Sequence, residues 1–207
     1  MKALLLVDLQ NDFMPDGPLS VPMGHHAVAA ANQAQKFFKL VVASKDWHPP
    51  EHLAFAVHHQ GKKPFDVIDL FGVTQTLWPV HCVANTDGAA FVNELDQSRI
   101  EHVVKKGEHK NVDSLSAFFD NAHRHQTGLG DYLKERGVDE IYLLGVATEY
   151  CVKFSALDGM KLGFKTNVII DGCQGVGNSA QDIPDAIAEM IQHGVRMLTM
   201  ADLAKEI

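Results

Sequence analysis

The chain has 207 residues, of which 46% are hydrophobic, with 26 acidic and 18 basic side chains and a formal net charge of −8 at pH 7. This length is sufficient for a full hydrophobic core, so we expect residues 1–207 to form a single domain. The acidic balance argues against nucleic acid or an anionic membrane as a partner and favours a protein that acts on a small molecule. Three widely spaced cysteines do not form a disulfide framework, so we expect a cytoplasmic protein.

Short apolar segments alternate along the chain with segments of helical periodicity. The first apolar segment, residues 3–7, is too short for a signal peptide or a membrane span and is typical of a buried strand. In chain order we expect further strands at residues 40–44, 100–104, 141–144, 165–170 and 195–200, and helices near 26–38, 130–136, 152–162 and 183–193. Residues 47–93, rich in Pro and His, are expected to form loops and short turns. This alternation predicts an α/β fold with a mostly parallel sheet covered on both faces.

Three reactive side chains follow predicted strands. Asp8 follows residues 3–7, and Lys106 follows residues 100–104. Before Cys151, an apolar strand is expected to break at Gly145, and a helix is expected to begin with Cys151 in its first turn. Because ligands bind beyond the carboxyl ends of parallel strands, we expect these side chains at one edge of the sheet. A buried carboxylate can exchange a proton with a thiol, an ammonium stabilises a thiolate, and a helix N-terminus can hold an oxyanion.

Each of these three residues also has a simpler interpretation. Cys151 could be a small buried hydrophobic residue, Asp8 a turn or cap residue, and Lys106 a solvated loop lysine. Their positions along the chain do not prove that they converge in space, so this alternative stays open.

A second group of residues is suited to a metal ion. Asp46 and His48 stand two residues apart, and His81 follows further along the chain. One carboxylate and two imidazoles can bind a divalent transition metal such as Zn, Fe or Mn and leave positions open for water or substrate. His52 could be a further ligand or could orient one, and we rank it below His81. The chain has 12 His, so their abundance alone could also explain this pattern.

Apolar side chains near these groups could form the walls of a binding site. Phe13 and Leu19 follow the first strand, Trp78 precedes His81, and Tyr150 adjoins Cys151. Flat aromatic walls suit a planar ring, although Phe and Trp are more often found in the core.

Five ordered segments resemble the bacterial nicotinamidases and pyrazinamidases, within the isochorismatase-like cysteine hydrolases. The segments are VDLQNDF at 7–13, SKDWHP at 44–49, WPVHC at 78–82, KG at 106–107 and GVATEYCV at 145–152. The resemblance extends through 113–121 and 171–173 and spans nearly the whole chain. It implies a three-layer α/β/α sandwich around a six-stranded, mostly parallel sheet.

The resemblance also implies roles for single residues. Asp8 would be the general acid and base, Lys106 its electrostatic partner and Cys151 the nucleophile. One divalent transition metal would be held by three ligands, with His52 an additional ligand in some members; the three are Asp46, His48 and His81.

Around the nucleophile, the resemblance implies a cis peptide between Val146 and Ala147 and an oxyanion hole made by the N–H groups of Ala147 and Cys151. The substrate would contact a wall formed by Phe13, Leu19, Trp78, Ala147 and Tyr150. Many relatives have Asp where this chain has Glu149, so the fine geometry of this turn is expected to differ.

The activity implied is hydrolysis of nicotinamide to nicotinate and ammonia through a cysteine thioester, in NAD salvage, and also of pyrazinamide to pyrazinoate. One alternative is hydrolysis of isochorismate or a carbamoyl amine on the same scaffold. Another is a metal-binding or thiol redox-sensor protein without enzymatic activity. The sequence leaves open which metal binds and whether the chain forms a homo-oligomer.

Overall fold

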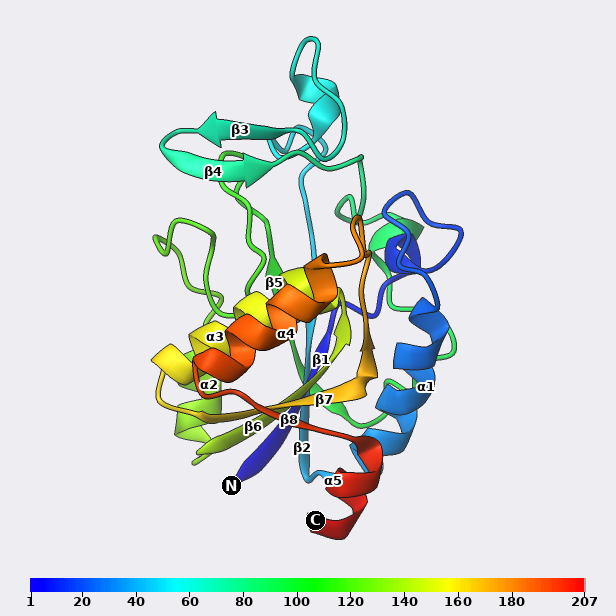
Figure 1. Ribbon diagram of the computed structural model, residues 1–207, viewed down its shortest axis with the longest axis vertical. Coiled ribbons are helices and arrows are strands. Elements are labelled where there is room, and N and C mark those ends of the chain that lie inside the picture. Colours follow the sequence, from blue (N-terminus) through cyan, green and yellow to red (C-terminus); the bar gives the residue numbers. More distant parts are fainter. Residues whose placement is uncertain (207) are drawn as a thin grey trace.

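A central parallel sheet organises the molecule (Figure 1). The computed structural model describes residues 1–206, so Ile207 of the expected domain lies outside the described residues. The sheet has six strands in the order β5-β2-β1-β6-β7-β8, and all neighbouring pairs are parallel. The strands are β1 (Lys2–Val7), β2 (Leu40–Asp46), β5 (Ile100–Lys106), β6 (Glu140–Val146), β7 (Lys165–Gln174) and β8 (Arg196–Leu198). The six predicted strands are confirmed.

Helices cover both faces of this sheet. They are α1 (Gly24–Ala34), α2 (Leu129–Glu135), α3 (Lys153–Lys161), α4 (Asp182–Gln192) and α5 (Met200–Glu206). Helices α1 and α5 lie on one face, and α2, α3 and α4 on the other (Figure 1). Right-handed connections between parallel strands account for the faces of α1, α2, α3 and α4. The three-layer α/β/α architecture is therefore confirmed, although α5 was not predicted. None of the described helices is long and apolar enough to cross a membrane.

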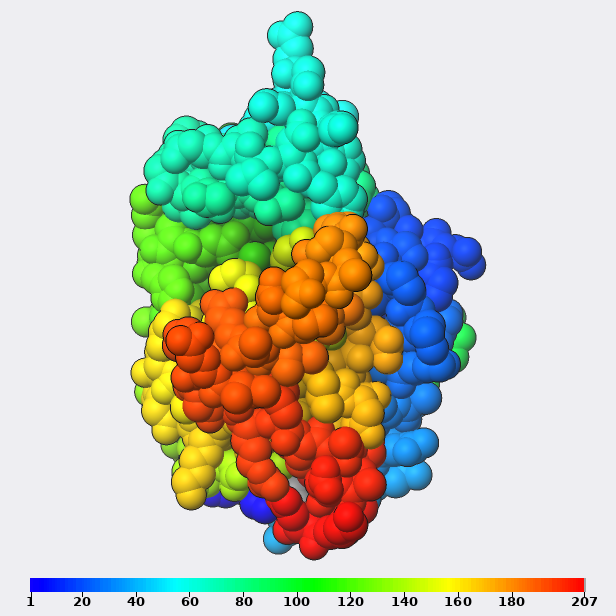
Figure 2. Space-filling view, viewed as in Figure 1, coloured from blue at the N-terminus to red at the C-terminus, as the bar shows by residue number. Residues whose placement is uncertain are grey.

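The segment expected to form only loops and short turns also contains an antiparallel hairpin, made of β3 (Val67–Leu70) and β4 (Val73–Thr76). The two turn residues, Phe71 and Gly72, have φ values of 55° and 82°, as in tight hairpin turns. Four-residue, largely exposed strands joined through a Phe carry little hairpin signal. This region, cyan in Figures 1 and 2, caps the end of the molecule toward which the parallel strands run.

The order of the strands fixes where a ligand can bind. From β1 the chain adds β2 and then β5 in one direction, and from β6 it adds β7 and β8 in the other. The order therefore reverses between β1 and β6, and a crevice forms at such a point beyond the carboxyl ends. Asp8 follows β1 and Cys151 lies shortly after β6, so both reach this crevice.

Candidate active site

Asp8 leaves the sheet directly after β1. Its φ of 51° lies in the left-handed region, which Asp tolerates better than most residues. Pairing between β1 and β2 ends at Val7 and Ser44, and the Ser44 hydroxyl donates to Asp8 Oδ1 at 2.6 Å. Burial raises the pKa of the Asp8 carboxyl, although the charge of Lys106 opposes this shift. A carboxyl with a raised pKa accepts a proton more readily than an ordinary aspartate and can return it.

Lys106 lies at the centre of the site. It ends β5 opposite Asp46 on β2, and its Nζ is 2.5 Å from Asp46 Oδ1 and 2.9 Å from Asp8 Oδ2. The same atom is 3.3 Å from Cys151 Sγ and donates to the Ser114 carbonyl oxygen at 3.1 Å. Burial alone would lower the pKa of Lys106, but the neighbouring carboxylates hold it well above its usual value. Lys106 therefore stays charged and joins Asp8, Asp46 and Cys151.

Cys151 lies in a single π-helical turn, Thr148–Val152, that follows β6. Its sulfur and an Asp8 carboxylate oxygen lie within 4.8 Å of each other. Burial raises the pKa of the Cys151 thiol well above its usual value, against the opposing charge of Lys106. The resting sulfur is therefore a thiol that needs a base when it attacks, and Asp8 is the carboxylate placed to act as that base.

The backbone before Cys151 differs from the sequence prediction in one respect. The strand does not break at Gly145 but continues to Val146, and a cis peptide joins Val146 to Ala147 as the resemblance implied. Gly145 has a φ of 136°, and a Cβ there would overlap the backbone of Val7. Glycine at this position thus permits close approach of β6 and β1 rather than ending the strand.

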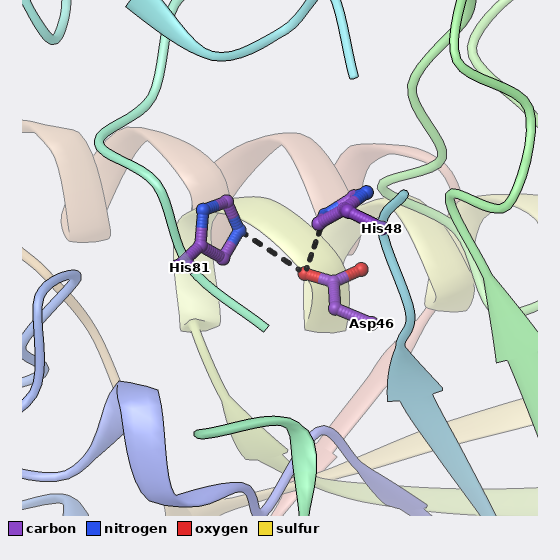
Figure 3. A group of neighbouring side chains, drawn as sticks. All are labelled: Asp46, His48 and His81. Carbon is purple, nitrogen blue, oxygen red and sulfur yellow. Dashed lines mark ion pairs between the residues drawn. The ribbon is translucent and has the colours of Figure 1, made fainter. Parts of the chain in front are cut away.

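Asp46, His48 and His81 form a buried group (Figure 3). Asp46 Oδ2 is 3.7 Å from His48 Nε2 and 3.6 Å from His81 Nε2. The carbonyl oxygens of Gly107 and Pro79 lie 3.0 Å and 2.8 Å from the Nδ1 atoms of His48 and His81. Since a carbonyl only accepts, each Nδ1 carries the proton and each Nε2 lone pair points into the group.

This donor set fits a divalent transition metal. Oδ1 of Asp46 is occupied by Lys106, which leaves Oδ2 for an ion. Burial would raise the pKa of Asp46, but the charge of Lys106 outweighs it and holds the pKa well below its usual range. A Cβ at Gly107 would overlap the His48 ring, so this glycine leaves room for the ligand. The group therefore offers an ionised carboxylate and two imidazole nitrogens.

His52 does not join this group. It lies beside His48, with ring centroids 4.6 Å apart, and forms a separate buried cluster with His48 and Asp113. Its Nδ1 accepts the Ala54 N–H at 3.1 Å, so its proton is on Nε2. Burial lowers the pKa of His52 to about 4, which keeps the ring neutral. His52 therefore contacts the His48 ring without a hydrogen bond to it, and its Nε2 has no partner among the described residues.

The expected substrate wall, Cys151 and two residues of the Asp46 group line one small cavity. Rings of Trp78 and Tyr150 meet edge to face within it, with centroids 5.0 Å apart. Its lining comprises all five predicted wall residues together with Asp46, His81, Asp113, Leu115, Cys151 and Val176. A larger cavity of about 700 Å³ lies between α3, α4 and the hairpin, but it contains none of the predicted site residues. The smaller cavity is therefore the one that brings the expected wall residues beside Cys151.

Several residues of the site were not identified from the sequence. The Gln10 amide accepts from the Asp46 N–H and donates to its carbonyl oxygen, both at 2.8 Å, and so fixes Asp46 where β1 has left the sheet. Asp113 accepts from Trp78 Nε1 at 2.9 Å and holds that ring. Both are buried polar residues. Both also lie inside the segments that resemble the family, and this position was the only indication in the sequence that they belong to the site.

Comparison with known proteins agrees with this geometry. Residues 2–202 match the model of the isochorismatase domain. The chain is 48% identical over 205 residues to a nicotinamidase of Escherichia coli, covering 97% of this chain and 96% of the relative. It also resembles the structure of an Acinetobacter baumannii nicotinamidase and pyrazinamidase, with a TM-score of 0.95, 42% identity and coverage of 98% and 97% of the two chains.

A pyrazinamidase of Pyrococcus horikoshii, whose structure was solved in complex with zinc, matches with a TM-score of 0.78 and 33% identity, covering 96% of this chain and 99% of that one. Both the sequence and the fold are thus shared over nearly the full length. The chain therefore belongs to the isochorismatase family and, within it, to the nicotinamidase and pyrazinamidase group.

Proposed function

We propose that this protein hydrolyses nicotinamide to nicotinate and ammonia. The observation that carries the proposal is the buried cluster in which Lys106 contacts Asp8, Cys151 and the Asp46 of a metal-binding group. A thiol with a base supports amide hydrolysis, and a metal group in the same cavity supports a substrate with a ring nitrogen to coordinate. The nicotinamidase from Escherichia coli, at 48% identity, supports the same substrate.

In the first half of the proposed reaction, Asp8 takes the proton of the Cys151 thiol as the sulfur attacks the carboxamide carbon. The N–H groups of Ala147, which precedes the π-helical turn, and of Cys151, which lies within it, hold the resulting oxyanion. Lys106 offsets the negative charge that forms beside two carboxylates. Asp8 then gives its proton to the leaving nitrogen, so the C–N bond breaks, ammonia departs and a thioester remains on Cys151.

In the second half, a water molecule loses a proton to Asp8 and attacks the thioester carbonyl. The C–S bond breaks, the Cys151 sulfur takes back the proton from Asp8, and the product leaves as nicotinic acid, which loses its proton to solvent and becomes nicotinate. Each cycle thus consumes one water and returns Asp8, Lys106 and Cys151 to their resting states.

Asp46, His48 and His81 would hold one divalent transition metal, Zn, Fe or Mn. When bound there, the ion supplies a Lewis acid that can accept the lone pair of the pyridine nitrogen and hold the ring in register. Trp78 and Tyr150 orient the ring by packing against its faces and edges, and Asp113 fixes the Trp78 ring.

Pyrazinamide has a similar size and also has a ring nitrogen meta to the carbon that bears the carboxamide, so we propose it as a second substrate. The protein would act on these free small molecules in the cytoplasm, in NAD salvage.

A panel of substrates tests the proposal. Purified protein would be incubated with nicotinamide, pyrazinamide, isochorismate and a carbamoyl amine, and acid product and ammonia would be quantified. We expect one ammonia for each nicotinate and turnover of both ring amides only. A Cys173→Ala variant is the matched control, because Cys173 is equally buried but lies on β7, and it should keep activity. Turnover of isochorismate or the carbamoyl amine without turnover of nicotinamide would refute the proposal.

A further inference from the structure

Residues 175–178, called the strap below, follow β7 and lie against the turn that carries the nucleophile. Two hydrogen bonds join the strap to that turn. The backbone N–H of Gly177 donates to Glu149 Oε1 at 2.8 Å, and Asn178 Nδ2 donates to the Tyr150 hydroxyl at 3.2 Å. The position of the strap thus depends on the two residues that precede the nucleophile.

One residue of the strap reaches the substrate cavity. Val176 is half-buried and lines the same cavity as Ala147 and Cys151. A β-branched side chain has few rotamers, so its methyl groups move with the backbone. A displacement of the strap therefore changes the width of the cavity.

The carboxylate of Glu149 packs closely against the backbone of the strap. Its side chain is buried, and a Cβ on Gly175 would overlap Glu149 Oε2 and the Ile183 side chain. The strap can lie this close only because residue 175 is glycine. Oε2 accepts no hydrogen bond from any residue that the structure describes. Contact between Glu149 and the strap therefore depends on the length of the side chain and on one acceptor oxygen.

We propose that Glu149 determines substrate specificity by setting the position of Val176 over the bound ring. This inference rests on the proposed nicotinamide hydrolysis. It adds that Val176 excludes from the cavity those pyridine carboxamides that have a substituent on the ring edge facing it. Aspartate at position 149 would be shorter by one C–C bond, roughly 1.5 Å, and would lose the bond to Gly177. The released strap would then admit the larger rings.

The test compares kcat/KM for nicotinamide with that for 5-methylnicotinamide and 6-methylnicotinamide. For at least one of the two methylated substrates, we expect Glu149→Asp to raise kcat/KM relative to that for nicotinamide by about tenfold. This is the discrimination that one methyl group provides in an apolar pocket. Glu149→Gln keeps both the length and the acceptor oxygen, so it should retain the wild-type ratio. A Glu149→Asp ratio equal to that of the wild type, or a Glu149→Gln ratio equal to that of Glu149→Asp, would overturn the proposal.

A second variant separates action through the strap from a general loss of structure. Val176→Ala should shift the ratio in the same direction, and Glu149→Asp should add nothing in that background. If Glu149→Asp does not fold, Val176→Ala alone decides, since an unchanged ratio there contradicts the proposal. Wild-type protein without activity on nicotinamide would refute the proposed function itself, whereas unchanged ratios in active protein would refute only the role of Glu149.

Discussion

Replacing Lys106 by Met should destabilise the protein strongly. Met keeps an unbranched, apolar side chain but removes the ammonium that lies 2.9 Å from Asp8 and 2.5 Å from Asp46. The two buried carboxylates, whose oxygens lie within 4.8 Å of each other, then have no cation between them. Removing one partner of a buried ion pair costs about 3–5 kcal/mol. At roughly 2–4 °C per kcal/mol for a chain of this size, Tm should fall by about 6–20 °C.

This loss should depend on pH. Burial already raises the pKa of Asp8, and without Lys106 the charge that opposes this shift is gone. A carboxyl whose folded pKa exceeds its unfolded value, about 3.9, binds more protons in the folded state. The free energy of unfolding of the variant therefore falls as pH rises from the unfolded pKa of Asp8 to its higher folded pKa. The deficit of the variant should be smaller at pH 5 than at pH 8.

Thermal unfolding of chelator-treated protein, followed by circular dichroism at both pH values, measures these effects. Lys105→Met is the matched control, because Lys105 is the preceding residue of β5 and is exposed. It should unfold close to the wild type at both pH values. The reasoning fails if Lys106→Met unfolds within about 2 °C of the wild type at pH 8, or if its deficit does not shrink at pH 5.

Three further predictions concern activity and metal binding. His48→Ala removes the Nε2 atom that faces Asp46 and should lower the metal content measured by elemental analysis. His193→Ala, at an exposed position, is the control and should not lower it. A fully metal-loaded His48→Ala variant would contradict the proposed role of His48 as a ligand. Trp78→Ala removes a cavity wall and should raise KM for nicotinamide about tenfold or more, with a smaller effect on kcat, and an unchanged KM would exclude this role. Because burial raises the pKa of Asp8, the acid limb of kcat/KM should lie above the ~3.9 of an ordinary aspartate, whereas a limb at or below that value would argue against Asp8 as the base.

The sequence carries much of the fold because the buried strands are nearly continuous apolar runs. Residues 3–7 are all buried in β1, and Asp8, directly after them, marks the carboxyl edge of the sheet. Parallel pairing then brings Asp46 opposite Lys106 and Val7 opposite Gly145, so residues far apart in the chain meet. The convergence of Asp8, Lys106 and Cys151 follows from this topology together with the strand-end rule.

Other features depend on contacts that no local pattern encodes. The Gln10 amide replaces a missing strand partner at Asp46, and Asp113 holds Trp78 across 35 positions of sequence. The grouping of His52 with His48 and Asp113, and the hydrogen bond that its Nδ1 accepts from the Ala54 N–H, are not predicted by spacing alone. Hairpin β3–β4 was not predicted because its strands have only four residues each and its turn begins with Phe71, which is not a typical hairpin-turn residue.

Release of ammonia from nicotinamide by the purified protein tests the central claim most directly. The assay would be run on wild-type protein, on the same protein after removal and return of the metal, and on Cys151→Ala. We expect release from the wild type, its loss on chelation, its recovery with added metal, and no turnover by Cys151→Ala at unchanged metal content. Undiminished release by Cys151→Ala, or no release by folded and metal-loaded wild-type protein, would contradict the account.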